Sequence, residues 1–152
     1  MSAKAPRRVV IGLGEDGRSC VQFDGEVPQL GPVAQLVWRT QTVPADNSSP
    51  QDAAAPYQMD FLHDGGTNFI ITEFPPGRDE LAFMHATDTI DYLVVISGAI
   101  TLVLEEGETV CGPGTLIVDR GVNHGWRNDG DVPAVYASVT LPAKPVGKGR
   151  TV

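Results

Sequence analysis

The sequence lacks long apolar runs and has few cysteines. No segment of the 152 residues approaches the ~20 consecutive apolar residues that a membrane-spanning helix requires. The N-terminal segment, MSAKAPRRVV, also lacks the apolar region of a secretory signal. These absences predict a cytoplasmic protein with no membrane partner. Cys20 and Cys111 lie far apart, and without an export signal they are expected to be reduced core residues rather than a disulfide.

Positive charge is scarce as well. The chain has 11 lysine and arginine residues against 19 aspartates and glutamates, which gives a formal net charge of −8 at pH 7. A surface with this excess of negative charge repels phosphate backbones. The composition therefore disfavours nucleic acid as a partner.

Helical periodicity is nearly absent, and short β-rich segments take its place. The 17 glycines and 12 prolines interrupt the runs of helix-forming residues, and many of them lie in turn signals. Near the C-terminus, Tyr136, Ser138 and Thr140 alternate with apolar residues, which is typical of a strand with two different faces. Many such strands predict an all-β sandwich or barrel. The expected strands are 8–11, 20–23, 35–40, 68–74, 82–85, 91–97, 100–105, 109–111, 115–118, 124–127 and 134–141.

One domain is expected over residues 1–152, with four parts. Residues 1–33 form an N-terminal β segment or arm, 42–57 a loop, 68–141 the barrel core and 142–152 a tail. The loop contains three prolines and little to bury. It is not a domain boundary, because the part that precedes it is too small to fold alone.

A glycine motif near the N-terminus imitates a nucleotide-binding site. The segment VVIGLGEDG matches G-x-G-x-x-G, a pattern that binds a dinucleotide only where a helix opens after the glycines. The residues that follow include Pro28 and Pro32 and cannot form such a helix. We therefore expect a β-hairpin that turns at Asp16-Gly17, and no nucleotide cofactor.

Histidines and acids between residues 74 and 128 occur at a particular spacing. The first cluster has Pro76-Gly77, His85 and Asp91 seven residues before Gly98, and the second has Gly114, Gly121, His124 and Asn128. Around the histidines the two clusters read MHxTxTxDY and RGxxHxWxN. Together they resemble the two motifs of the cupin superfamily. The resemblance implies an antiparallel jelly-roll β-barrel whose two motifs face each other across a small-molecule pocket.

The chain departs from the family pattern in its first motif. Cupins usually supply two histidines and a glutamate there, whereas this chain has one histidine, His85, and an aspartate, Asp91. Two alignments are open: His85 takes the first histidine position and Thr87 the second, or Phe83 takes the first and His85 the second. In either case the resemblance leaves His85, Asp91 and His124 as the candidate catalytic residues.

Three interpretations of His85, Asp91 and His124 stay open. Two imidazoles and a carboxylate can hold a divalent metal such as Fe, Zn, Mn or Ni. Without a metal, the same groups can act as acids and bases near neutral pH. In the third interpretation, both histidines are satisfied core residues of a barrel that has no activity.

The implied pocket has candidate substrate-binding residues beside this set, namely Phe83, Thr87, Leu93, Trp126 and Arg120. Leu93 shares a strand face with Asp91, and Trp126 shares one with His124, because alternate residues of a strand point to the same side.

The remaining polar candidates match no motif position. Arg120 is expected at the rim of the pocket or, with Asp119, in a surface ion pair or turn. His63 is expected at a turn or on the surface.

The resemblance implies a small-molecule enzyme. The expected reaction is that of a lyase, isomerase, cyclase or decarboxylase that transfers protons on a carbonyl-bearing substrate of secondary or aromatic metabolism. An Fe(II)-dependent oxygenase with the same three ligands is the first alternative, and a non-catalytic binding module is the second. The resemblance also implies a homodimer, to which residues 7–23 could add a strand at the edge of the partner's sheet.

Overall fold

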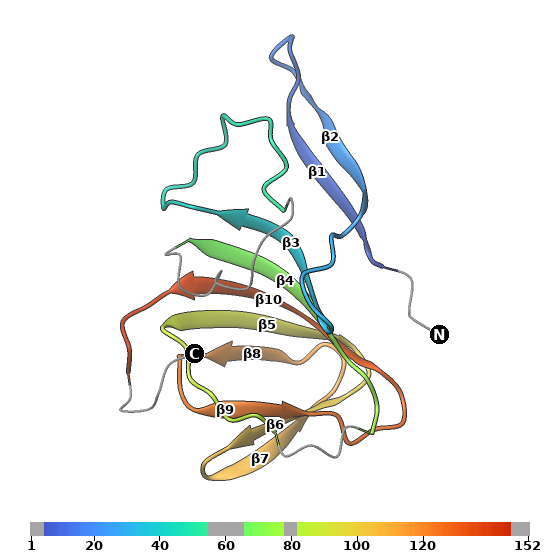
Figure 1. The fold of residues 1–152 in the computed structure, drawn as a ribbon, viewed down its shortest axis with the longest axis vertical. Helices are drawn as coiled ribbons and strands as arrows, with labels where there is room; N and C mark the ends of the chain where they lie inside the picture. Colours follow the sequence, from blue (N-terminus) through green and yellow to red (C-terminus); the bar gives the residue numbers. More distant parts are fainter. Residues whose placement is uncertain (1–4, 55–65, 78–81, 147–152) are drawn as a thin grey trace.

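The computed structural model of the chain describes residues 5–54, 66–77 and 82–146 (Figure 1). His63 lies outside the described residues. The described residues form ten strands and no helix, so none of them belongs to a helix that could span a membrane. The strands are β1 (Arg7–Leu13), β2 (Ser19–Glu26), β3 (Ala34–Thr40), β4 (Thr67–Phe74), β5 (Thr89–Ser97), β6 (Ile100–Leu104), β7 (Gly107–Cys111), β8 (Leu116–Asp119), β9 (His124–Arg127) and β10 (Ala134–Pro142).

Two antiparallel sheets form the body of the protein. The larger sheet has the strand order β3-β4-β10-β5-β8, and the smaller one has the order β7-β6-β9. The sheets are stacked in Figure 1, with the smaller one at the bottom. A hydrophobic core joins both sheets, and its most buried members include Val95 and Ile100. The expected all-β, antiparallel jelly-roll barrel is confirmed.

Strand β10 of the larger sheet has a polar inner face and an apolar outer face. On β10, Tyr136, Ser138 and Thr140 are buried on the side that faces the smaller sheet. Val135 and Val139 lie on the opposite side, because successive strand residues point to opposite faces. The alternation seen in the sequence therefore separates a pocket wall from an apolar outer surface.

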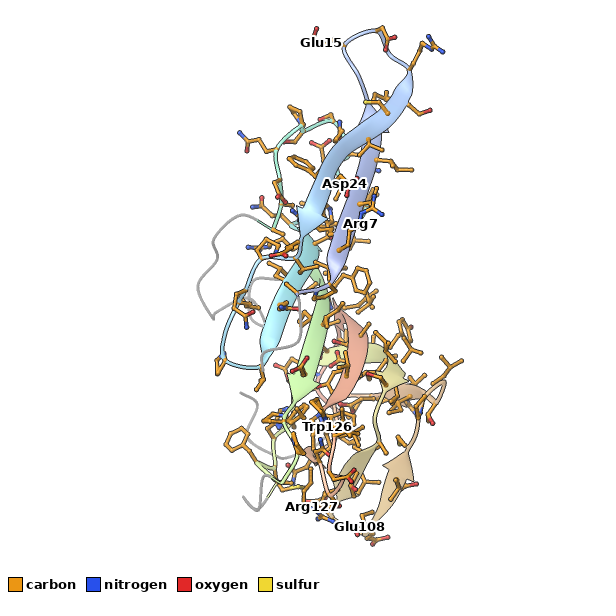
Figure 2. The ribbon with its side chains drawn as sticks, turned by 90° about the vertical axis from the view of Figure 1, so that its right-hand side faces the viewer. Arg7, Glu15, Asp24, Glu108, Trp126 and Arg127 are labelled. Atoms are coloured by element: carbon orange, nitrogen blue, oxygen red, sulfur yellow. The ribbon has the colours of Figure 1, made fainter. Side chains whose placement is uncertain are left out.

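The β1–β2 hairpin stands off from the barrel at the β3 end, and Figure 2 shows Glu15 at its tip, far from Trp126. Its turn is closed by a hydrogen bond from the Gly14 N–H to the Arg18 carbonyl, 2.9 Å long. The predicted hairpin is confirmed in place of a nucleotide-binding turn. The expectation that Cys20 is a core residue is wrong, because β2 lies in this arm and the thiol is free and exposed, whereas Cys111 is free and buried.

Arg8 attaches the arm to the body. Its guanidinium is buried, pairs with the carboxylate of Asp52, and donates to the Val37 carbonyl at 3.0 Å. It also lies over the rings of Phe23 and Trp38, 5.9 and 6.0 Å from their centroids. One face of the arm is thus held by β3 and by the loop that follows β3.

The predicted strand over residues 82–85 is wrong. This segment makes only an isolated bridge, in which His85 and His124 exchange two backbone hydrogen bonds of 2.9 Å. A longer ladder would need the carbonyls of Phe83 and Val122 as acceptors. Both carbonyls instead accept from imidazole Nδ1 atoms, that of His85 at 3.0 Å and that of His124 at 2.9 Å. The two rings therefore replace the backbone pairing on either side of the bridge.

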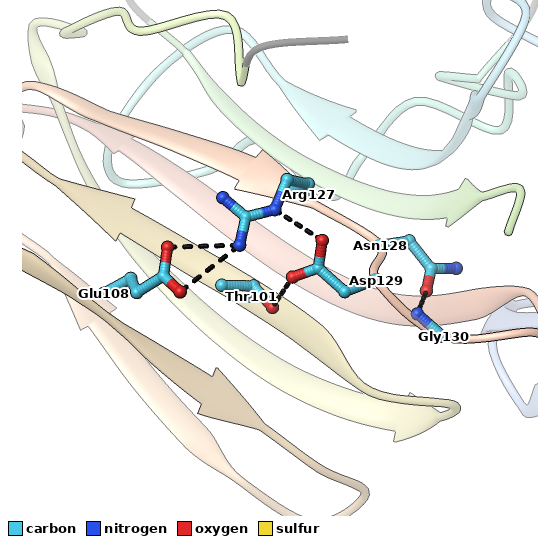
Figure 3. Close-up of polar contacts among 6 residues, drawn as sticks. All are labelled: Thr101, Glu108, Arg127, Asn128, Asp129 and Gly130. Atoms are coloured by element: carbon cyan, nitrogen blue, oxygen red, sulfur yellow. Dashed lines mark hydrogen bonds and ion pairs between the residues drawn. The ribbon is translucent and has the colours of Figure 1, made fainter. Parts of the chain in front are cut away.

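Asn128 holds the turn that follows β9. Its amide group donates to the carbonyls of Phe74 and Val132 at 3.0 and 2.9 Å, and its Oδ1 accepts from the Gly130 N–H at 2.9 Å. Figure 3 shows the Gly130 contact beside an exposed ion-pair network around Arg127. Exposed pairs of this kind contribute little to stability, whereas Asn128 is almost fully buried. The motif asparagine is therefore a structural residue.

Replacing Asn128 by alanine is expected to lower the free energy of unfolding by about 2–4 kcal/mol, because three hydrogen bonds of a buried side chain are lost. Chemical denaturation monitored by circular dichroism measures the change. Asn123→Ala is the control, since Asn123 makes one exposed hydrogen bond, to Glu105, and should change stability by under about 1 kcal/mol. Equal losses in the two variants would show that Asn128 does not anchor the turn.

Candidate functional site

A cavity of about 140 Å³ lies between the two sheets. The inner faces of β3, β4, β5 and β10 form one wall, and β9 and the segment before β5 form the other. The residues that line it are Ala34, Ile70, Thr72, His85, Thr87, Asp91, Leu93, His124, Trp126, Tyr136, Ser138 and Thr140.

Most of the predicted site residues meet in this cavity. It is lined by His85, Thr87, Asp91, Leu93, His124 and Trp126. Their roles stay predictions, but the two motifs do face each other across one pocket. The rings of His85 and His124 pack against each other, with centroids 4.5 Å apart.

Phe83 and Arg120 lie outside this cavity, and their predicted substrate-binding roles stay predictions. Neither belongs to the residues that line the cavity. Phe83 is 71% exposed, and its ring stacks on His85 with centroids 5.5 Å apart. Arg120 is exposed because it follows Asp119, which points inward.

Asp119 is buried against His124, which contradicts the prediction of a surface ion pair, whereas the alternative, a turn, agrees with its contacts to the loop backbone. The Oδ2 atom of Asp119 lies 3.0 Å from His124 Nδ1, and both side chains are less than one-tenth exposed. The other carboxylate oxygen, Oδ1, accepts from the N–H groups of Gly121 and Val122 at 3.0 and 3.3 Å. The loop backbone thus fixes the carboxylate, and the carboxylate in turn fixes the imidazole.

The hydrogen-bond partners assign the tautomers of the two histidines. Nδ1 of His124 lies between two acceptors, the Asp119 carboxylate and the Val122 carbonyl, so it carries a proton. Nδ1 of His85 faces the Phe83 carbonyl and carries a proton for the same reason. Each ring is left with its Nε2 for exchange with a substrate.

The environments of the two histidines move their pKa values in opposite directions. Burial lowers the pKa of His85, and the neighbouring His124 adds to this effect. Burial also acts to lower the pKa of His124, but the hydrogen bond and charge of Asp119 outweigh it, and the net pKa is raised. Although burial acts to raise the pKa of Asp119, the His124 hydrogen bond brings it below its ordinary value. Near neutral pH, His85 is therefore the neutral ring and His124 holds its proton more tightly.

Asp91 faces the same cavity with an unusual carboxyl group. Burial raises its pKa to about 6, although a hydrogen bond with Thr89 offsets part of the shift. Its Oδ1 atom is buried and has no hydrogen-bond partner. A buried carboxyl oxygen without a partner is costly as an anion, so the group retains a proton up to about this pH and can donate it.

The shifted pKa of Asp91 predicts a pH-dependent stability. The unfolded carboxyl has a pKa near 3.8 and the folded one near 6, so the fold favours the protonated form. The contribution of Asp91 to the free energy of unfolding is therefore greatest below about pH 4 and falls between pH 4 and 6. Above pH 6 it stays constant, about 3 kcal/mol lower than in acid. The Asp91→Asn variant should lack this fall, so its advantage over wild type should grow from near zero at about pH 4 to about 3 kcal/mol above pH 6.

Urea denaturation of both proteins at each pH measures the difference. Asp131→Asn is the control, because Asp131 is exposed and this variant should follow the wild-type curve. A constant offset between Asp91→Asn and wild type at all pH values would contradict a raised pKa for Asp91.

The predicted metal ligands meet only part of what a metal centre requires. Both imidazoles are oriented through Nδ1, as ligating histidines commonly are, and Asp91 offers a buried oxygen without a partner. However, no three His, Cys, Asp or Glu side chains in the described ranges lie close enough together to hold one ion. The expected three-ligand set is therefore not assembled among these residues.

Several residues that line or support the pocket were not predicted from the sequence. Asp119 stands where cupins often have proline, so no motif indicated a role. Tyr136, Ser138 and Thr140 were recognised as one strand face but not as a pocket wall, although three polar residues opposite an apolar face were a usable signal. A side-chain hydrogen bond links Thr72 to Tyr136 on the adjacent strand, and burial raises the pKa of the Tyr136 phenol.

Comparisons with known proteins agree with the fold. The cupin domain family matches residues 70–140. The phomopsin biosynthesis cluster proteins C′ and D of Diaporthe leptostromiformis are each 37% identical over 160 residues, which cover 94% of this chain and 82% of each relative. A cupin-domain-containing oxidoreductase of Neurospora crassa is 29% identical, over 95% of this chain and 80% of the relative.

Among solved structures, an RmlC-like cupin family protein with a double-stranded β-helix fold, from Methanocaldococcus jannaschii, is similar with a TM-score of 0.45 and 17% identity. The match covers 50% of this chain and 70% of that chain. Because the cupin domain match spans both motifs and the relatives extend over nearly the whole length, the chain belongs to the cupin superfamily.

Proposed function

We propose that this chain is an enzyme of secondary metabolism that moves a proton on a small carbonyl-bearing molecule. Relatives that are 37% identical carry names from the phomopsin biosynthesis cluster, which supports a biosynthetic role. The observation that carries the proposal is the arrangement of three titratable groups in one cavity, with the pKa of His85 lowered and those of His124 and Asp91 raised. Groups whose pKa values are moved apart in this way are typical of acid–base catalysis.

The roles follow from the protonation states. The neutral ring of His85 accepts a proton at Nε2 from the carbon next to the substrate carbonyl. His124 donates a hydrogen bond to the carbonyl oxygen, where negative charge develops as that proton leaves, and Asp91 is a second donor below about pH 6, where it keeps its proton. Asp119 stabilises the positive charge on His124 and holds its ring in position. Return of the proton from His85 to another carbon gives isomerisation. If the neighbouring carbon carries a leaving group, that group departs with the electron pair and takes the proton, which is elimination. If the enolate carbon instead attacks a second carbonyl of the same substrate, the new alkoxide takes the proton, which is cyclisation.

The cavity limits the size and charge of the substrate. A protein cavity of roughly 150 Å³ is large enough for benzene, so about 140 Å³ accepts a group the size of a single ring. The described lining residues include no lysine or arginine, and they include several hydroxyl side chains. We therefore expect a neutral ring with a carbonyl or hydroxyl group rather than a carboxylate or phosphate.

Solvent deuterium exchange tests the proposal without knowledge of the product. Neutral single-ring ketones and aldehydes are incubated with the protein in D₂O, and NMR follows deuterium entry at the carbon next to the carbonyl. Wild type should accelerate exchange for at least one compound that quenches Trp126 fluorescence, measured in a Trp38→Phe background. His85→Gln should lose the acceleration, and Asp131→Asn should keep it. Compounds that bind without any accelerated exchange would refute proton transfer and favour a binding module.

An oxidoreductase is the second candidate function. The Neurospora crassa relative, named as a cupin-domain-containing oxidoreductase, aligns over 95% of this chain, and this observation favours it. Oxygen consumption with the same compounds separates the two candidates. Uptake that depends on substrate and protein would favour the oxidoreductase, whereas exchange without uptake supports proton transfer.

A further inference from the structure

The inner face of β10 carries one hydroxyl group that has no hydrogen-bond partner in the described part of the chain. Three polar side chains lie on this face. Tyr136 shares a hydrogen bond with Thr72 on β4, and Thr140 accepts from the Nδ2 atom of Asn68 at 3.3 Å. Ser138 lies between Tyr136 and Thr140, and none of the residues that the structure describes is hydrogen-bonded to its hydroxyl. Ser138 is therefore the exception on this strand.

The Ser138 hydroxyl is buried, yet it faces the cavity. Ser138 is only 6% exposed, and it lines the cavity from the side of the larger sheet. Buried polar groups in folded proteins nearly always have a partner, and a hydroxyl without one destabilises the fold relative to an apolar side chain of the same size. Since the packing of the described residues does not require a hydroxyl here, its partner is expected to be a molecule in the cavity.

Apolar side chains flank Ser138 on both sides. Its direct cross-strand neighbours are Ile70 on β4 and Leu93 on β5, and both line the cavity. β10 is the central strand of the larger sheet (Figure 1), so pairing on both sides fixes the backbone at this position. One hydrogen-bonding group on a rigid apolar surface is typical of a site that orients a small molecule.

The two histidines reach the cavity from the wall opposite Ser138. His85 belongs to the segment before β5 and His124 to β9, whereas Ser138 belongs to the larger sheet. A ring whose carbonyl lies at the Nε2 atoms of the histidines therefore presents its far edge to the larger sheet. We propose that Ser138 is a specificity-determining residue, which binds a hydroxyl group on the ring carbon opposite the reacting carbonyl. The substrate class is then a neutral, hydroxylated cyclic ketone, an assignment that rests on the proposed function.

Asp91 and Ser138 lie on the same wall but contact different parts of the ring. Asp91 pairs with Thr140, and Ser138 pairs with Leu93. Asp91 is thus a diagonal neighbour of Ser138, and diagonal neighbours on one sheet face are about 7–8 Å apart. The carbonyl end of the ring therefore belongs to Asp91 and the histidines, and the hydroxyl end to Ser138. A serine hydroxyl can both donate to and accept from a substrate hydroxyl.

Two matched cyclohexanones test this role through binding. 4-Hydroxycyclohexanone and 4-methylcyclohexanone differ by one group of similar size, of which only the hydroxyl forms hydrogen bonds. Quenching of Trp126 fluorescence in a Trp38→Phe background gives both dissociation constants. The preference for the hydroxy compound over the methyl compound should fall about 10-fold in Ser138→Ala, because one buried hydrogen bond to the ligand is lost. Ser97→Ala, at an exposed serine of β5, should keep the wild-type preference.

The possible outcomes separate this assignment from the proposed function. An unchanged preference in Ser138→Ala, an equal loss of affinity for both compounds, or no binding of the hydroxy compound to wild type would overturn the role of Ser138. Binding does not require proton transfer. A reduced preference without deuterium exchange would therefore support the hydroxyl site and refute the proposed reaction. Exchange with an unchanged preference would support the reaction and refute the site. Thermal melting of Ser138→Ala should stay at or above that of wild type, since the lost hydroxyl has no partner in the described part of the chain.

Discussion

Replacing Asp119 by asparagine is expected to slow the catalysed proton exchange by about 10²- to 10⁴-fold, the usual contribution of an acid–base group. The carbonyl oxygen of asparagine can still accept from the Gly121 and Val122 N–H groups that Asp119 holds now. What the variant loses is the negative charge beside His124, 3.0 Å from Nδ1. Without that charge His124 gives up its proton at lower pH and no longer donates to the substrate oxygen near neutrality.

The pH dependence distinguishes this loss from damage to the fold. In wild type the exchange rate should fall as pH rises through the raised pKa of His124. In Asp119→Asn this fall should move to lower pH, so the exchange rates of the two proteins should differ least at low pH. Asp131→Asn serves as the control for a lost carboxylate on the surface. A rate reduced by the same factor at every pH would indicate a structural defect instead.

Replacing Gly98 by alanine is expected to lower the free energy of unfolding by about 3–5 kcal/mol, combining strain and steric overlap. Gly98 has a φ of +67° in the turn between β5 and β6. A methyl group there would lie 2.4 Å from the Pro133 carbonyl oxygen and 2.8 Å from the Ala134 Cα. Both contacts are with backbone that leads into the central strand β10, so the clash is not relieved by moving a side chain.

Gly107→Ala is the matched control for this substitution. Gly107 also has a positive φ, +91°, but nothing lies within 4 Å of the position of an added methyl group. Gly107→Ala should lower the free energy of unfolding by only about 1–2 kcal/mol, which is the cost of placing a non-glycine residue in the left-handed backbone region. Urea denaturation measures both variants. Equal losses would show that the contact with the β9–β10 connection does not determine the requirement for glycine at position 98.

The strand pattern could be predicted from the sequence because turn signals and alternation are local properties. The hairpin around Asp16-Gly17 and the two-faced strand β10 are examples. The failure at residues 82–85 has a different cause. There the imidazole of His85 donates to the Phe83 carbonyl, which a longer strand pairing would need as an acceptor. No local sequence pattern predicts which acceptor a side chain binds. Cys20 was misplaced for a related reason, since alternation does not show whether a hairpin packs on the body or projects from it.

The pocket was predicted in part because its histidines lie in recognisable motifs. His85, Asp91 and His124 meet in one cavity, as the resemblance implied. Asp119 was missed because the burial of an aspartate depends on a partner, His124, whose ring orientation is a property of the tertiary structure. The three-ligand metal centre could not be judged from residue types alone, since it depends on whether the side chains converge on one point.

The most direct test of the proposed chemistry is the titration of His124 itself. NMR of ring-labelled histidine follows His85 and His124 separately, with assignment by the His85→Gln and His124→Gln variants. We expect the pKa of His124 above 6.5 and that of His85 below it. In Asp119→Asn the pKa of His124 should fall, while Nδ1 stays bonded to the Val122 carbonyl. A His124 that titrates at or below 6.5 in wild type, or is unmoved by the loss of Asp119, would contradict the account.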